Sequence, residues 1–283
     1  MTNFVFYDTM QTMDKLTKTT AFSNPTYDNL ADAPFYLFFK KETFLLDVPH
    51  YHDSIEIIYM IHGKAKTYVN GTSYEFSEGD ISICNTQQVH FYENYPQEKL
   101  AFCVVLSHKY THDFRQVHKD TAFPSLLTNK EHNAKIYALL TEWFNLENRT
   151  FLTDCAYANL LLDMLVKLYG FSDMKAINPL NATAIELVNY INENYANPLT
   201  LETAAKHFGY STEYFSKMFK HAVGKNFLSF LNTTRAQQAK KMLTASDRKL
   251  SLQEICTACG FNNTVSMYRN LKRLQIAQDL ILD

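Results

Sequence analysis

The last hundred residues contain an internal repeat, which restricts the fold of the chain more than its composition does. The stretch LTLETAAKHFGYSTEYFSKMFK, residues 199–220, aligns with LSLQEICTACGFNNTVSMYRNLK, residues 250–272. In each copy a hydroxyl residue, Thr200 or Ser251, precedes a short apolar-patterned segment that a glycine ends. A hydroxyl side chain caps the start of a helix, and glycine suits a tight turn after it. The repeat therefore predicts two helix–turn–helix motifs.

Two cysteines, Cys256 and Cys259, lie three residues apart in the second copy. They occupy the positions that Ala205 and Phe208 hold in the first copy, on the core side of a short helix. A zinc site needs about four ligands, and no second Cys/His pair lies nearby in the sequence. We therefore expect buried structural thiols, with a metal or redox role as the alternative.

Specific residues in both copies match the sequence pattern of a known protein family. The second copy has the pattern's Ile255, Gly260 and Phe261, but the segment after Lys272 differs from it. The residues of the first copy and of the helix after it are Phe219, Lys220, Gly224, Phe227, Leu231, Arg235, Ala239 and Leu243. With these residues the C-terminal part resembles the DNA-binding domain of AraC/XylS-type transcriptional regulators.

The resemblance implies that the second helix of each motif enters a DNA major groove. Lysine can donate to guanine and glutamate can accept from cytosine, whereas a solvated helix face is the alternative for any single residue. By resemblance Lys220 and Lys272 contact phosphates. The residues expected on the DNA-facing side are Thr212, Glu213, Ser216, Lys217 and Lys220 in the first motif, and Thr264, Val265, Tyr268, Arg269 and Lys272 in the second.

The charge of the chain is divided unevenly. Residues 181–283 carry 12 Lys and Arg against 8 Asp and Glu, a balance of +4, while the rest carries 15 against 21, a balance of −6. A basic C-terminal part is consistent with double-stranded operator DNA as a partner, although a balance of this size is also common in proteins that bind no nucleic acid.

The N-terminal part shows a different periodicity. From about residue 35 to 105, short β-type runs (FYLFF, EIIYMI, KTYVN, YEF, ISIC and LAFCVVL) alternate with turn signals, among them Asn70-Gly71. Asn-Gly between two such runs predicts a tight hairpin. Many short strands at regular spacing predict an antiparallel sandwich or barrel.

Helical spacing replaces this pattern over residues 126–146 and 153–170. We expect the apolar face of the second helix to form a homodimer contact, with packing inside the chain as the alternative. Gly170 and Pro179 then mark a break and a linker. The apolar face consists of Ala158, Leu161, Leu162, Leu165 and Leu168.

A further spacing lies in the β-rich part. His50, His52, Glu56 and Gly63 match the first cupin motif, and Gly79, His90 and Asn94 match the second. The chain thus resembles a cupin barrel, which implies that His50, His52, Glu56 and His90 converge. In metal-binding cupins these residues hold one divalent transition metal ion.

We expect a metal-free effector site here, because Asn85 and Gln87 replace the Pro and Gly of the second motif. The expected effector is a small molecule, a sugar in particular, held by His50, His52, Glu56 and His90 and stacked on Tyr59 and Tyr68. Barrel core is the alternative for each aromatic residue. A divalent metal, as a cofactor or as the signal, is the alternative for the polar residues.

These patterns together predict an α+β multidomain protein. Its expected parts are a cupin-like β-barrel with helices over residues 1–110, a helical dimerisation segment over 111–171, a linker over 172–180 and an all-α double helix–turn–helix domain over 181–283. We expect a homodimeric, cytoplasmic transcriptional regulator without enzymatic activity. RNA polymerase is a further candidate partner, and no membrane partner is expected. The alternative function is a metal-dependent cupin enzyme or a metal-sensing regulator.

Overall fold

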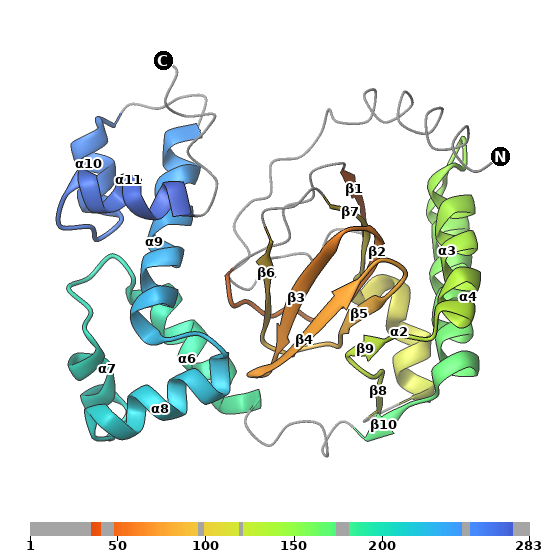
Figure 1. The fold of residues 1–283 in the computed structure, drawn as a ribbon, viewed down its shortest axis with the longest axis horizontal. Helices are drawn as coiled ribbons and strands as arrows, with labels where there is room; N and C mark the ends of the chain where they lie inside the picture. Colours follow the sequence, from red (N-terminus) through yellow and green to blue (C-terminus); the bar gives the residue numbers. More distant parts are fainter. Residues whose placement is uncertain are drawn as a thin grey trace.

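The computed structural model describes residues 35–40, 48–95, 99–118, 121–173, 181–244 and 250–273. Figure 1 shows the sheets and three helices in the N-terminal part, and a group of helices formed by the C-terminal part. The predicted α+β class, with β-structure first and helix–turn–helix structure last, is confirmed.

The larger sheet of the N-terminal part has five strands in the order β1-β7-β2-β5-β9. Its neighbouring strands pair antiparallel throughout. The five strands are β1 (Phe35–Lys40), β7 (Leu100–Leu106), β2 (Ile55–His62), β5 (Ile81–Cys84) and β9 (Leu126–Leu127).

The smaller sheet has three strands in the order β4-β3-β6, with β3 spanning Lys64–Val69, β4 Thr72–Ser77 and β6 His90–Asn94. Asn70 and Gly71 both have positive φ, 48° and 79°, at the turn between β3 and β4. This conformation is that of a two-residue hairpin turn and confirms the hairpin prediction. The sequence did not predict β6, because its apolar run is short and pairing with β3 stabilises it.

Side-chain alternation along β2 divides the core into two layers. Ile55, Ile57, Tyr59 and Ile61 lie in a cluster with the helices, whereas Ile58 and Met60 lie in a cluster between the two sheets. Glu56 shares the parity of Ile58 and Met60. Its carboxylate therefore points between the sheets.

Three helices cover the outer face of the larger sheet: α2 (His108–Val117), α3 (Lys130–Phe144) and α4 (Phe151–Tyr169). The leucine face of α4 packs into this layer, and Leu161 and Leu165 are 0% exposed. This face is intramolecular core, so the expectation that it forms the dimer contact is wrong. A homodimer through another surface stays a prediction.

The first two residues of the expected linker belong to a strand. Ser172 and Asp173 form β10, which pairs antiparallel with β8 (Thr121–Ala122). The remaining linker positions, 174–180, lie outside the described residues, as does the segment 274–283. Within the described ranges, no helix combines the length and the apolar character that a bilayer span requires.

The C-terminal part consists of helices around two clusters. The first motif contains α7 and α8 and the second contains α10 and α11, with α9 between them. Arg235 of α9 donates to the carbonyl oxygens of Tyr195 (2.7 Å) and Asn197 (2.9 Å) and ties α9 to the loop after α6. The helices are α6 (Asn181–Asn194), α7 (Leu201–His207), α8 (Thr212–Val223), α9 (Phe227–Thr244), α10 (Leu252–Ala258) and α11 (Thr264–Arg273).

Local chemistry explains the shape of both motifs. Thr200, Ser211 and Ser251 accept a backbone N–H at the starts of α7, α8 and α10.

Cys256 and Cys259 are buried free thiols, and burial raises the pKa of Cys259 to about 11. The prediction of structural thiols in the core is confirmed.

Candidate functional site

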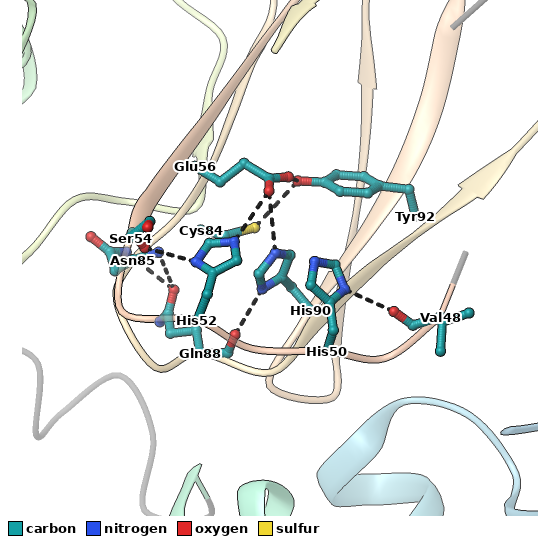
Figure 2. Close-up of polar contacts among 10 residues, drawn as sticks. All are labelled: Val48, His50, His52, Ser54, Glu56, Cys84, Asn85, Gln88, His90 and Tyr92. Carbon is teal, nitrogen blue, oxygen red and sulfur yellow. Dashed lines mark hydrogen bonds and ion pairs between the residues drawn. The ribbon is translucent and has the colours of Figure 1, made fainter. Parts of the chain in front are cut away.

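Four side chains from two distant segments converge between the sheets (Figure 2). They are His50, His52 and Glu56, at and before the start of β2, and His90, the first residue of β6. One potential ligand atom from each lies within 4.8 Å of the others, and all four residues are buried. Among the described residues, this is the one group of three or more His, Cys, Asp or Glu side chains close enough to hold a metal ion.

Backbone carbonyls orient all three imidazoles in the same way. The Nδ1 atoms of His50, His52 and His90 lie 2.8, 3.1 and 2.8 Å from the carbonyl oxygens of three nearby residues, Val48, Ser54 and Gln88. A carbonyl oxygen only accepts, so each Nδ1 carries the hydrogen. In a neutral ring the Nε2 atom is then left with a lone pair.

The free edges of two of these rings face one carboxylate. Nε2 of His52 lies 3.3 Å from Oε2 of Glu56, and Nε2 of His90 lies 3.6 Å from the same oxygen. Among the described residues, the Nε2 atom of His90 has no hydrogen-bond partner although it is fully buried. Lone pairs that face a carboxylate oxygen repel it unless a positive charge, a proton or a metal ion, lies between them.

The charge states of Glu56 and His50 suit the binding of a metal ion. Burial alone would raise the pKa of Glu56, but the adjacent imidazoles of His52 and His90 hold that pKa well below its usual value. Burial, together with the nearby His90, lowers the pKa of His50 well below its usual value. The site therefore contains an ionised carboxylate and at least one neutral imidazole, the forms in which these groups bind metals.

Tyr92 contacts the cluster, although it is not among the effector residues expected from the sequence. Its hydroxyl donates to Oε1 of Glu56 at 2.6 Å and lies 3.5 Å from Sγ of Cys84. This bond occupies one carboxylate oxygen and leaves Oε2 to face the imidazoles. Strand alternation is the signal that could have found it, because Tyr92 follows His90 by two positions on β6.

Hydrogen bonds from Asn85 and Gln87 hold the loop before β6 in place. Gln87 adopts a positive φ of 58°, and its backbone N–H donates to the carbonyl of His52 at 2.8 Å. The Asn85 side chain both accepts from and donates to the backbone of Phe123, at 2.8 and 3.0 Å. Asn85 and Gln87 therefore do not prevent His90 from reaching the other three side chains of the cluster.

Two predicted effector residues lie elsewhere. Tyr59 points to the helical side of β2 and stacks on Tyr137, with 5.1 Å between ring centroids. Tyr68 stacks on Phe91, with 4.3 Å between ring centroids, and donates to Glu93 at 2.9 Å. Their assignment to the effector site is wrong, because the sequence did not show which strand face each would occupy.

The predicted DNA-facing residues all lie on α8 and α11, the second helices of the two motifs. Phe215 and Phe219 are buried on the opposite side of α8. Lys217 forms an exposed ion pair with Glu213 at 2.8 Å, an interaction that the sequence analysis did not anticipate. The residues on the DNA-facing side are exposed, except for Ser216, Thr264 and Tyr268, which are half-buried.

Two family models match the chain and together span more than half of it. The model described as AraC-like ligand binding domain matches residues 43–142, and the model described as helix-turn-helix domain matches residues 204–275. The first match contains the whole His/Glu cluster, and the second contains α8 and α11.

The relatives carry titles of the same kind. The HTH-type transcriptional activator RhaS of Enterobacter sp. (strain 638) is 24% identical over 225 residues, which is 76% of this chain and 80% of the relative. An HTH-type transcriptional regulator of Staphylococcus aureus is 24% identical over 232 residues, which is 78% of this chain but only 30% of that longer relative. A crystal structure of ToxT from Vibrio cholerae O395 aligns with a TM-score of 0.46 at 12% identity, over 89% of this chain and 100% of that one.

Proposed function

Because the chain belongs to the AraC family of transcriptional regulators, we propose that it binds operator DNA under the control of the His/Glu site. The two helix–turn–helix motifs would bind successive major grooves, about 34 Å apart on one side of the duplex. Family membership favours regulation over catalysis as the purpose of the site.

We further propose that the occupant of the site is a divalent transition metal ion, held by His50, His52, Glu56 and His90. One observation carries this proposal. All three imidazoles donate from Nδ1 to a backbone carbonyl, the arrangement that orients metal-binding histidines, and two of their Nε2 atoms lie near the same carboxylate oxygen. Imidazole and carboxylate donors suit iron, manganese, nickel or zinc.

A metal-free sugar site remains the competing proposal, with less support from the geometry. The aromatic residues expected to stack on a sugar, Tyr59 and Tyr68, point away from the cluster. The four polar residues are buried, and the most exposed of them, Glu56, is only 7% exposed.

Metal analysis and genomic footprinting of the full chain test both parts of the proposal. We expect about one equivalent of metal per chain and a set of footprints that EDTA alters. Metal-free protein whose footprints respond to a sugar would instead support the metal-free sensor. Protein that leaves no footprints under any condition would contradict the regulator proposal itself.

Tyr92→Phe tests how the carboxylate is oriented. The change removes the hydroxyl that donates to Oε1 of Glu56 but keeps the ring. Loss of an outer hydrogen bond of this kind costs about 10–100-fold in metal affinity, and titration calorimetry would measure it. Tyr74→Phe, on β4 of the same sheet, is the matched control. Equal metal affinities of the original chain, Tyr92→Phe and Tyr74→Phe would contradict the role of Tyr92 in orienting Glu56.

Lys217→Ala tests the DNA-facing side of α8. We expect a loss of about 1–3 kcal/mol at one operator position, because the ammonium can donate to guanine. Lys167→Ala is the matched control, since Lys167 also forms an i,i+4 ion pair, with Asp163, but lies on α4. Binding measured on a series of operator variants decides the role. A uniform loss on all sequences would make Lys217 a phosphate contact.

A further inference from the structure

The segments that carry the histidines have a second face, which contacts the DNA-binding part. His50 and His90 form an antiparallel bridge, with backbone hydrogen bonds of 3.0 and 2.8 Å in the two directions. Directly bridged residues share one face, and their neighbours point to the other face. Tyr51, Val89 and Phe91 therefore point away from the His/Glu site.

These outward residues pack against helices of the C-terminal part. Val48, Tyr51 and Val89 are buried in one cluster with residues of α6, α7, α8 and α9. The hydroxyl of Tyr51 donates to Oδ1 of Asn189 on α6 at 2.9 Å. The ammonium of Lys225, just after α8, lies 4.9 Å from the centre of the Phe91 ring.

Two glycines allow the backbones to meet at this contact. A Cβ atom on Gly71, in the β3–β4 turn, would collide with the backbone carbonyl oxygen of His221 on α8. A Cβ atom on Gly224, which caps the end of α8, would lie 3.2 Å from side-chain atoms of both Tyr68 and Phe91. In Figure 1 the β3–β4 turn lies beside this end of α8.

We infer that residues 48–52 and 89–91 form a two-sided joint that couples occupancy of the His/Glu site to docking of the first helix–turn–helix motif. The inference rests on the proposed function, since it takes a divalent ion as the occupant. On the inner face an ion bound to His50, His52 and His90 ties the two segments together. On the outer face those segments hold α6 and the end of α8.

The link between the two faces is short. His50 donates from Nδ1 to the carbonyl of Val48, and the Val48 side chain packs in the cluster with α6 and α8. An occupied site therefore stabilises the docked arrangement, and by reciprocity docking raises the affinity of the site for the ion. The helix so held, α8, is the one that carries Glu213, Ser216 and Lys217.

Hydrogen exchange of the full chain, with Zn²⁺, Mn²⁺ or Ni²⁺ each added alone, tests the joint. We expect a bound ion to slow amide exchange in residues 48–52 and 89–91 and also in α6 and the last turn of α8. Slower exchange confined to the site segments, with α6 and α8 unchanged, would overturn the inference while leaving the metal proposal intact.

Gly71→Ala is designed to weaken the contact on the outer face, because the added Cβ atom would collide with the carbonyl oxygen of His221 on α8. We expect the variant to retain the ion while losing the ion-dependent protection of α6 and α8, with lower ion affinity than the original chain. Gly170→Ala is the matched control, because Gly170 also has a positive φ, 68°, but a Cβ atom there would meet no described residue within 4 Å. Tyr51→Phe is a milder second variant that removes only the bond to Asn189. Ion-dependent protection of α6 that persists in Gly71→Ala and Tyr51→Phe would contradict the joint.

A third variant distinguishes failure of the joint from failure of the metal proposal. His50→Ala removes the bond to Val48 and needs no ion for its effect, and His62→Ala, at the exposed end of β2, is its control. Faster exchange of α6 and the end of α8 in His50→Ala supports the link between the His50 segment and these helices, even in a chain that binds no metal. Exchange there equal to that of His62→Ala overturns it.

Discussion

Replacing His90 with alanine is expected to abolish the thermal stabilisation that a divalent ion gives to this chain. An ion that binds only the folded state stabilises it by about 2.7 kcal/mol at a concentration 100 times its Kd. For a chain of this size that corresponds to a rise in Tm of about 5–10 °C. His90 is fully buried, and its Nε2 atom has no hydrogen-bond partner among the described residues. The alanine variant therefore loses a ligand atom for the ion without losing a hydrogen bond at Nε2.

Differential scanning calorimetry with and without added ion measures this effect. His62→Ala is the control, because His62 lies on β2 but its side chain is 62% exposed and outside the cluster. We expect the control to keep the full rise in Tm. A rise of equal size in His90→Ala, or none in the original chain with any of the candidate metals, would contradict the metal proposal.

Leu161→Glu is expected to unfold the N-terminal part. Leu161 is 0% exposed on α4 and packs into the cluster between the helices and the larger sheet. Shortening a buried leucine costs about 2–5 kcal/mol, and an unpaired carboxylate in its place adds a desolvation cost. We therefore expect a loss of more than about 4 kcal/mol in the free energy of unfolding.

Leu160→Glu provides the matched control one residue earlier on the same helix. Leu160 is 46% exposed, so the same change there adds a charge without opening the core. Denaturant unfolding of both variants, followed by sedimentation of those that fold, separates stability from assembly. A folded, monomeric Leu161→Glu protein would restore the dimer assignment of the leucine face. A folded but monomeric Leu160→Glu protein would place the dimer contact on the exposed side of α4.

The C-terminal domain could be predicted closely because its signals are local. The caps Thr200 and Ser251 and the glycines after the short helices act within a few residues of themselves. Repetition of the pattern then distinguishes it from chance. The buried state of Cys256 and Cys259 followed from their alignment with apolar residues of the first copy.

Two predictions failed where the partner of a surface is distant in the sequence. The apolar face of α4 was evident from its period, but the period does not say whether a sheet of the same chain or a second chain covers it. Likewise the aromatic character of Tyr59 and Tyr68 was visible, but their strand faces depend on pairing across the two sheets.

The sequence by itself determined the double helix–turn–helix domain and the β-rich N-terminal part, since both rest on spacing within short segments. It also indicated the four residues of the His/Glu site, through the resemblance of two separate segments to the cupin motifs. The tertiary structure alone decided which atoms of that site are free, because Val48, Ser54 and Gln88 bind the Nδ1 atoms and Tyr92 binds one oxygen of Glu56. It also placed Tyr51 and Val89 against α6 and α8, far along the chain. The physical reason is that strand pairing assigns side chains to opposite faces, and only the folded chain determines what each face meets.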